Sequence, residues 1–356
     1  MSGLTVPVLR LGTRRSALAV TQARWVADRV EKAAADAGRP VRVELVELLS
    51  DGDRTSAPLA SFGGIGVFVN RLRRALLSGE IDVAVHSLKD LPTAPEPGLV
   101  VAALPPREDP RDVLVARDGL TLGELPAGSR IGTGSPRRAA QLRGLGLGLE
   151  VVDLRGNVDT RLAAVGTGRL DGVVLARAGL LRLGREDEAT EVLDPLLMLP
   201  APGQGALAVE CRRPAAVVDG RDEHDAEHDL AVLAAVRPLD DPATRAAVTA
   251  ERRLLAALEA GCAAPLGALA EVVDGDDGPE LTARAVVAAV DGSVSLRRSL
   301  TGPVDDPEAL GNALAALLVE DGAGELVPPR LRTSIDPAEI PPAEPRTPST
   351  TREGDQ

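Results

Sequence analysis

The sequence predicts an α/β fold, in which two α/β lobes around a cleft are followed by a smaller α+β domain. Strand and helix patterns alternate through residues 8–199, and Pro-rich crossings at 104–112 and 199–205 interrupt this alternation twice. Three alternating segments nearer the C-terminus are joined by turns rich in Asp and Gly. Strands that alternate with helices form mostly parallel sheets, whereas strands joined by short turns pair antiparallel. We therefore expect two helix-covered sheets and one three-stranded antiparallel sheet.

The first lobe is expected to begin with a short apolar strand at residues 8–12. Ser16 is suited to cap the helix that follows, because its hydroxyl can accept a hydrogen bond from a free backbone N–H of the first turn. Three more elements are expected in this lobe, a strand at 41–49, a helix at 68–77 and a buried strand at 81–85.

The two crossings enclose a second alternating unit, which predicts a second lobe at 110–200 with strands at 151–154 and 172–176. After the second crossing, the apolar run 206–210 could return to the first sheet. We therefore assign 6–105 together with 205–222 to the first lobe.

The third domain is expected at 228–327. Asp241 followed by Pro242 is typical of a helix start, and the helix should run to residue 260, with Gly261 ending it. The strands are expected at 267–273, 280–290 and 293–300, before a last helix at 307–319. Seven prolines follow from Pro328 onward and predict a disordered tail at 328–356.

Composition argues against several classes of partner. The chain has a formal net charge of −13, and Trp25, Phe62 and Phe68 are its only aromatic residues. Such a chain has neither the basic surface nor the stacking groups that bind nucleic acid. The chain has no unbroken apolar run of about 18 residues, so no membrane-spanning helix is expected. We read no signal peptide, and two cysteines make no disulfide framework, so a cytoplasmic protein is expected.

Arginine is concentrated in the second lobe. Ten arginines against four acidic residues lie between Arg130 and Arg185. Like charges repel, so a ligand with several negative charges is the simplest explanation. The guanidinium fork can hold a carboxylate or a phosphate through two parallel hydrogen bonds. The alternative is an Arg-rich surface of one helical domain.

The segment 131–138, IGTGSPRR, predicts an anion site. A strand leads through two glycines to Ser135 as helix cap and to Pro136, so that free backbone N–H groups face Arg137 and Arg138. A third glycine is missing for a dinucleotide fingerprint, and no phosphate-binding GxxxxGK loop occurs. A nucleotide is therefore not implied.

Two further strand ends present arginine. The segment 155–161, RGNVDTR, follows an expected strand with Arg155, Gly156 and Arg161, and Arg182 follows another. A helix cap with surface arginines is the alternative for each. Arginine at three strand ends makes that alternative less attractive.

Lys89 and Asp90 follow the strand at 81–85, and Arg14 follows the first strand. Ligands of such sheets bind at the carboxyl ends of the strands. Asp90 could act as an acid or base, or could stabilise a developing cation, since a carboxylate among arginines stays ionised. An exposed Lys–Asp pair in a turn is the alternative.

Cys262 lies in a loop just after a helix and could be a nucleophile, a covalent attachment point or a packed side chain. Cys211, inside a strand pattern, is expected to be structural. His224 and His228 are spaced i, i+4 without an evident third ligand, so no metal site is expected.

Seven motifs together resemble the porphobilinogen deaminase (hydroxymethylbilane synthase) family. They occur in the family's order over residues 8 to 330: LGTRRSALAVTQA, AVHSLKDLPT, REDPRDVL, IGTGSPRRAAQL, LRGNVDTRL, LPAPGQGALAVEC and LEAGCAAPLG. The resemblance implies two periplasmic-binding-protein-like lobes and a third domain that carries a dipyrromethane cofactor in thioether linkage. Cys262 matches the family's attachment cysteine.

The resemblance also implies the reaction. Four porphobilinogen units are condensed onto the cofactor with release of ammonia, and hydrolysis then releases hydroxymethylbilane. Asp90 matches the aspartate that stabilises positive charge on a pyrrole ring, with Lys89 and Arg14 as the other catalytic residues. The expected cofactor-binding residues are Ser16, Ser87, Lys89, Asp90, Ser135, Arg137, Arg138, Arg155, Gly156, Arg161 and Arg182.

One segment departs from the family. The glycine-rich segment 61–66 has no lysine, where many members carry two.

We expect porphobilinogen as substrate and a monomeric enzyme. The main alternative is a non-catalytic anion-binding protein of the same two-lobed fold, and a redox or acyl-transfer enzyme that uses Cys262 is more distant.

Overall fold

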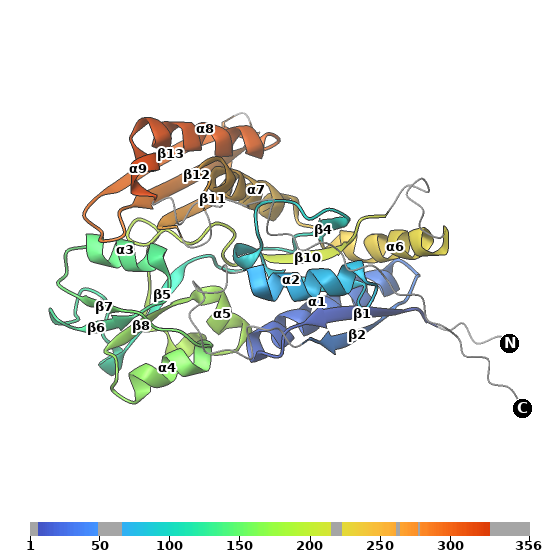
Figure 1. Cartoon of the computed structure of the whole chain (residues 1–356), viewed down its shortest axis with the longest axis horizontal. Helices are drawn as coiled ribbons and strands as arrows, with labels where there is room; N and C mark the ends of the chain where they lie inside the picture. Colours follow the sequence, from blue (N-terminus) through green and yellow to red (C-terminus); the bar gives the residue numbers. More distant parts are fainter. Residues whose placement is uncertain (1–5, 49–65, 215–222, 261–263, 277, 328–356) are drawn as a thin grey trace, which may run out of the picture.

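A computed structural model describes residues 6–48, 66–214, 223–260, 264–276 and 278–327 of the chain. Two five-stranded sheets and one three-stranded sheet organise these residues. The third sheet and its helices lie over both of the larger sheets (Figure 1). The predicted α/β class, with two lobes and a small antiparallel sheet, is confirmed. The expected tail at 328–356 lies outside the described residues.

The first sheet has the strand order β2-β1-β3-β10-β4. Its strands are β1 (Val8–Thr13), β2 (Arg42–Glu47), β3 (Val83–Ser87), β4 (Leu99–Ala103) and β10 (Leu207–Arg212). β1 pairs in parallel with β2 and β3, whereas β10 pairs antiparallel with β3 and β4. The expected return of the chain to the first sheet is therefore confirmed.

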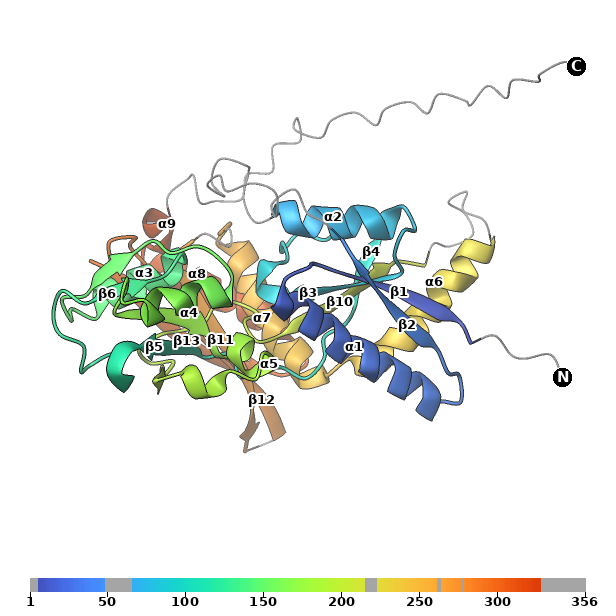
Figure 2. The same ribbon diagram turned by 90° about the horizontal axis from the view of Figure 1, so that it is seen from below.

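Helices cover both faces of this sheet, as Figure 2 shows for α1 and α2. The helices are α1 (Ala17–Asp36), α2 (Gly66–Leu77) and α6 (Glu223–Val236). α1 and α6 share one core with the sheet, and α2 packs into another. The predicted cap of α1 is confirmed, because Ser16 Oγ accepts a hydrogen bond from the N–H of Ala19 at 3.4 Å.

The second sheet repeats the topology of the first, with the order β7-β6-β8-β5-β9. Its elements are β5 (Asp112–Ala116), β6 (Arg130–Gly132), α3 (Pro136–Gly144), β7 (Glu150–Val152), α4 (Val158–Gly166), β8 (Gly172–Ala176), α5 (Arg177–Arg182) and β9 (Glu191–Val192). The reversed strand β5 occupies the place that β10 occupies in the first sheet. α3 packs on one face, and α4 and α5 pack on the other.

The C-terminal domain is built on the antiparallel order β11-β12-β13. Its elements are α7 (Pro242–Ala257), β11 (Leu266–Gly275), β12 (Gly278–Ala288), β13 (Ser295–Pro303), α8 (Pro307–Glu320) and α9 (Ala323–Leu326). α7 and α8 form its core with the sheet.

The start of α7 is as predicted, since Asp241 accepts a hydrogen bond from the N–H of Thr244 at 2.8 Å. Its expected end at residue 260 is wrong. The N–H of Leu258 still donates to the carbonyl of Leu254. Glu259 then adopts a left-handed φ of 50°, which ends the helix. The predicted terminator Gly261 lies outside the described residues.

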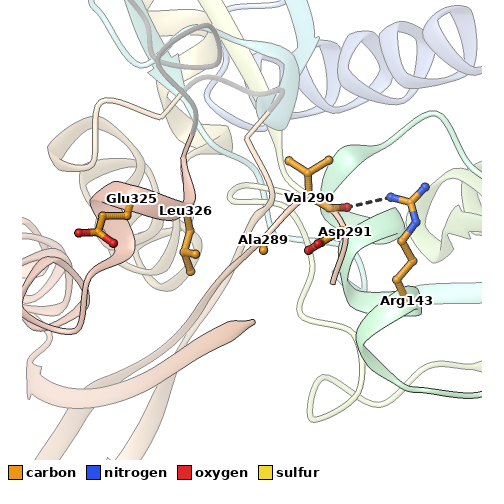
Figure 3. Close-up of a pocket in the computed structure, with 6 residues that line it drawn as sticks. All are labelled: Arg143, Ala289, Val290, Asp291, Glu325 and Leu326. Atoms are coloured by element: carbon orange, nitrogen blue, oxygen red, sulfur yellow. Dashed lines mark hydrogen bonds between the residues drawn. The ribbon is translucent and has the colours of Figure 1, made fainter. Parts of the chain in front are cut away.

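The turn between β12 and β13 docks on α3 of the second lobe. Arg143 Nη1 donates to the carbonyl of Val290 at 2.8 Å (Figure 3). Gly292 has a φ of 79°, and a Cβ atom there would lie 2.6 Å from the Cβ of Arg143. Only glycine fits this approach. A cavity of about 730 Å³ lies beside the contact, and none of the expected site residues lines it.

Two connections join the lobes, residues 104–111 between β4 and β5 and residues 193–206 between β9 and β10. The buried carboxylate of Glu251, on α7, binds both of them. It accepts hydrogen bonds from Arg107 Nη1 and Nη2 at 2.7 and 3.0 Å and from the N–H of Gly203 at 2.6 Å. A fourth bond, of 2.8 Å, comes from the N–H of Ala270 in β11. One side chain thus joins the C-terminal domain to both connections.

Replacing Glu251 with Gln removes the charge and leaves the guanidinium of Arg107 without its carboxylate. We expect the free energy of unfolding to fall by about 3 to 5 kcal/mol, as measured by urea unfolding. The control Glu271→Gln removes a carboxylate of β11 that pairs with Arg284 at the surface. That change should cost at most about 1 kcal/mol. Equal losses in the two variants would contradict the role of Glu251.

Candidate functional site

The strand ends of the first lobe present Arg14, Ser16, Ser87, Lys89 and Asp90, as expected. β1 and β3 are neighbours in the sheet, so the segments that follow them lie side by side. After β3 the chain forms a single 3₁₀ turn, Leu88–Asp90, in which Lys89 is half-buried and Asp90 is exposed. Ser87 Oγ lies 3.4 Å from the side-chain amide of Gln22 on α1.

Lys89 faces inward, toward the connections between the lobes. Its Nζ donates to Oε1 of Gln204 at 3.3 Å. The pKa of Lys89 is lowered to about 8, chiefly by burial. The charges of Arg138 and Arg137 also lower this pKa, whereas those of Asp90 and Asp112 raise it. These groups therefore lie close enough to influence one another.

Gln204 bridges the two lobes. Its Nε2 donates at 2.7 Å to the carbonyl of Pro110 and at 2.7 Å to Oδ1 of Asp112, the first residue of β5. Lys89 in the first lobe and Asp112 in the second are thus joined through one side chain of the second connection.

Arg137 and Arg138 lie inside the protein, around the fully buried Asp112. Arg138 donates to Asp112 Oδ1 from Nε at 3.1 Å and from Nη2 at 2.7 Å, and Arg137 Nη1 donates to Oδ2 at 2.8 Å. Burial by itself would raise the pKa of Asp112, but the charges and hydrogen bonds of the two arginines hold that pKa well below its usual range. The structure thus gives protein partners to two arginines that the sequence predicted as ligand-binding forks, because the charge of Asp112 needs them.

One hydrogen-bond donor of this cluster has no acceptor among the described residues. Arg137 Nε is buried and has no hydrogen-bond partner among the described residues. Such a donor costs free energy unless a ligand or a water accepts from it.

Arg161 and Arg182 differ from the paired arginines. Both are half-buried, and both donate to backbone carbonyls, Arg161 Nε to Gly156 at 2.9 Å and Arg182 Nη2 to Gly205 at 2.6 Å. Burial lowers the pKa of each guanidinium. Within the described part of the chain neither makes an ion pair with a carboxylate. Two partly desolvated positive charges therefore remain to be neutralised by an anion.

The loops before α3 and α4 have the predicted form. Ser135 Oγ accepts from the N–H of Arg138 at 3.5 Å, and Asn157 caps α4. Gly156 has a φ of 118°, and a Cβ atom there would lie 2.8 Å from the side chain of Thr160, so glycine is required. Arg155 is exposed, with its Nε 3.4 Å from a carboxylate oxygen of Asp153.

Sequence reasoning did not assign Asp112 or Gln204. A charged residue that opens an otherwise apolar strand, as Asp112 does in DVLVA, is the signal that could have indicated a buried ion pair. Gln204 stands between two glycines in the second crossing, which signals little beyond a turn.

The remaining candidates have different outcomes. Cys262, the expected attachment residue, lies outside the described residues. Cys211 is buried in β10, and burial raises the pKa of its thiol to about 12, which fits the expected structural role. His228 Nε2 lies 3.0 Å from Oδ1 of the buried Asp82. This histidine therefore contacts the carboxylate that also pairs with Arg10 and Arg212. None of the helices that the structure describes is long and apolar enough to cross a membrane.

Comparisons with known proteins agree with the motifs. The family model "Porphobilinogen deaminase, dipyromethane cofactor binding domain" matches residues 9–219, and "Porphobilinogen deaminase, C-terminal domain" matches residues 245–320. A porphobilinogen deaminase of Nocardia farcinica is 57% identical over 324 residues, which cover 90% of this chain and 88% of that protein. One of Mycobacterium bovis strain BCG is 55% identical over 325 residues, which cover 90% of this chain and 98% of that protein.

Solved structures resemble the chain more distantly. A ligand-binding component of an ABC-type import system from Staphylococcus aureus aligns with a TM-score of 0.36 and 15% identity, covering 70% of this chain and 73% of that one. So weak a likeness carries no argument about function. The two family models and the sequence relatives suffice by themselves: this chain belongs to the porphobilinogen deaminase family.

Proposed function

We propose that this chain builds its tetrapyrrole at the Lys89–Asp90 turn, on a dipyrromethane held by Cys262. The protein is a transferase of porphyrin biosynthesis, which condenses four porphobilinogen units with release of ammonia and then hydrolyses the product to hydroxymethylbilane. The observation that carries the proposal is a pair of half-buried guanidinium groups at strand ends of the second lobe, those of Arg161 and Arg182. Neither has a carboxylate partner among the described residues.

The side chains at the strand ends fit the cofactor and the growing chain. Each porphobilinogen carries an acetate and a propionate, so every ring brings two carboxylates. Arg161 and Arg182 offer desolvated positive charge for them, and the Nε of Arg137 offers a buried donor without a partner among the described residues. The half-buried Arg14 of the first lobe and the exposed Arg155 of the second can add further contacts to carboxylates. When bound, the dipyrromethane supplies the free pyrrole α-carbon to which the next ring is joined.

Asp90 is the residue that we assign to act on the reacting ring. Loss of ammonia from porphobilinogen and formation of the new bond both put positive charge on a pyrrole. The exposed carboxylate of Asp90 can stabilise that charge and can take up the proton that the pyrrole α-carbon releases. Lys89, which faces inward, holds one end of the turn through Gln204.

The organisation of the protein belongs to the same proposal. We assign 6–105 with 205–222, 110–200 and 228–327 as its three domains, and the membership of the strands in three sheets supports this division. We also propose that the enzyme is a monomer of the cytoplasm, as expected from the sequence.

Intact-mass measurement tests the cofactor assignment. We expect the purified protein to carry an adduct of two pyrrole units, and Cys262→Ala to lose it, since the thioether needs the sulfur. The control Cys211→Ala should keep the adduct, because Cys211 is buried in β10. An unmodified parent protein without turnover of porphobilinogen would instead favour the anion-binding alternative.

Replacing Asp90 with Asn tests the catalytic carboxylate. The variant should keep the two-pyrrole adduct and should lose turnover by about 100-fold or more, because the charge and the proton acceptor are both removed. Turnover is measured as release of hydroxymethylbilane, with Asp36→Asn, at an exposed ion pair of α1, as control. Full activity of the Asn variant would remove Asp90 from the mechanism.

The pKa of Lys89 predicts an alkaline limit. Because burial lowers this pKa to about 8, the ammonium group is charged below pH 8 and neutral above it. We expect turnover to decline as the pH rises through about 8. In Lys89→Arg, whose side chain stays charged, the decline should move to higher pH. A profile that is flat from neutral pH to well above this value would show that the charge of Lys89 does not matter.

A further inference from the structure

Arg252 of the C-terminal domain reaches the Lys89–Asp90 turn of the first lobe. It extends from α7, and its guanidinium donates to three backbone carbonyls. Nη1 lies 2.8 Å from the carbonyl of Leu91 and 3.4 Å from that of Leu88, and Nη2 lies 2.6 Å from that of Pro92. These carbonyls flank Lys89 and Asp90 on both sides.

The turn needs such support. It consists of one 3₁₀ turn, in which the N–H of Leu91 donates to Leu88 at 3.1 Å, and Ser87 makes no side-chain cap. Carbonyls at a helix end lack partners within the helix and carry partial negative charge. A guanidinium satisfies several of them at once, because its donors are held in a rigid plane.

The same face of α7 also packs against the turn. Val248 lies one helical turn before Arg252 and shares a buried apolar cluster with Leu88 and Leu91. Glu251, the neighbouring residue, binds both connections between the lobes. The helix that supplies the guanidinium is therefore itself fixed relative to the first lobe.

We propose that Arg252 is a positioning residue, which sets the place of the Asp90 carboxylate and the Lys89 ammonium at the reacting ring. The proposal rests on the proposed function, since it takes Asp90 as the group that acts on porphobilinogen. α7 also leads in sequence toward Cys262, five residues after its last helical residue. One helix thus supports the catalytic turn and precedes the residue that carries the growing chain.

The test compares Arg252→Met and Arg252→Lys with the control Arg253→Met. Arg253, next on the helix, donates instead to Asn312 of α8 at 2.8 Å and makes no bond to the turn among the described residues. Three quantities are measured for each holoenzyme: backbone hydrogen exchange in peptides covering 86–93, kcat and KM for porphobilinogen, and the adduct mass. The thermal midpoint reports on overall stability.

We expect exchange in 86–93 to accelerate about tenfold in Arg252→Met, because about one to two hydrogen bonds' worth of free energy is lost. The value of kcat should fall about 10- to 100-fold with little change in KM, since a small misplacement of a reacting group slows chemistry strongly. Arg252→Lys, which keeps the charge and some of the hydrogen bonds, should recover part of both effects. Arg253→Met should match the parent.

Unchanged exchange and unchanged kcat in Arg252→Met would overturn the proposal. A lower thermal midpoint with parental kcat would overturn it too, because the contact would then be structural only. If Arg252→Met fails to fold, Arg252→Lys decides by the same two measurements. A parent protein without adduct and turnover would refute the proposed function instead, and the exchange data would still report whether Arg252 holds the turn.

Discussion

Glu251 places a carboxylate where both connections between the lobes meet the C-terminal domain. A charge removed from water must be paired and hydrogen-bonded, or it destabilises the fold by several kcal/mol. Here Arg107 supplies the charge, and the N–H groups of Gly203 and Ala270 complete the shell. Because these partners come from three parts of the chain, satisfying one buried carboxylate also fixes how those parts are arranged.

The same constraint separates the arginines of the second lobe into two groups. Arg137 and Arg138 are largely used by Asp112, and their charge serves the structure. Arg161 and Arg182 donate only to backbone carbonyls within the described residues, so no described carboxylate neutralises their charge. An acidic protein, with a net charge of −13, can thus still hold positive charges that no carboxylate of the described residues pairs with.

The C-terminal domain acts on both lobes at once. Through α7 it contacts the 3₁₀ turn that bears Lys89 and Asp90, and through the turn at Gly292 it docks on α3, whose first residues face Asp112. The two lobes share one strand order, so the ends of corresponding strands carry the candidate site residues in both. A domain that contacts both lobes can hold the two sets of strand ends in a fixed position relative to each other.

The sequence by itself determined the fold class, most element positions and the family. Periodicity, Ser16 and Asp241 as caps, and the two Pro-rich crossings depend on interactions between near neighbours, which a linear pattern records. The motifs likewise identified the arginine-bearing strand ends. Only the tertiary structure decided which arginines pair with Asp112, that Gln204 bridges the lobes, and that Arg252 reaches the Lys89–Asp90 turn. Arg252 and Leu91 are 161 positions apart. Pairing across such separations depends on how whole sheets and helices pack, and no local pattern in the sequence encodes it.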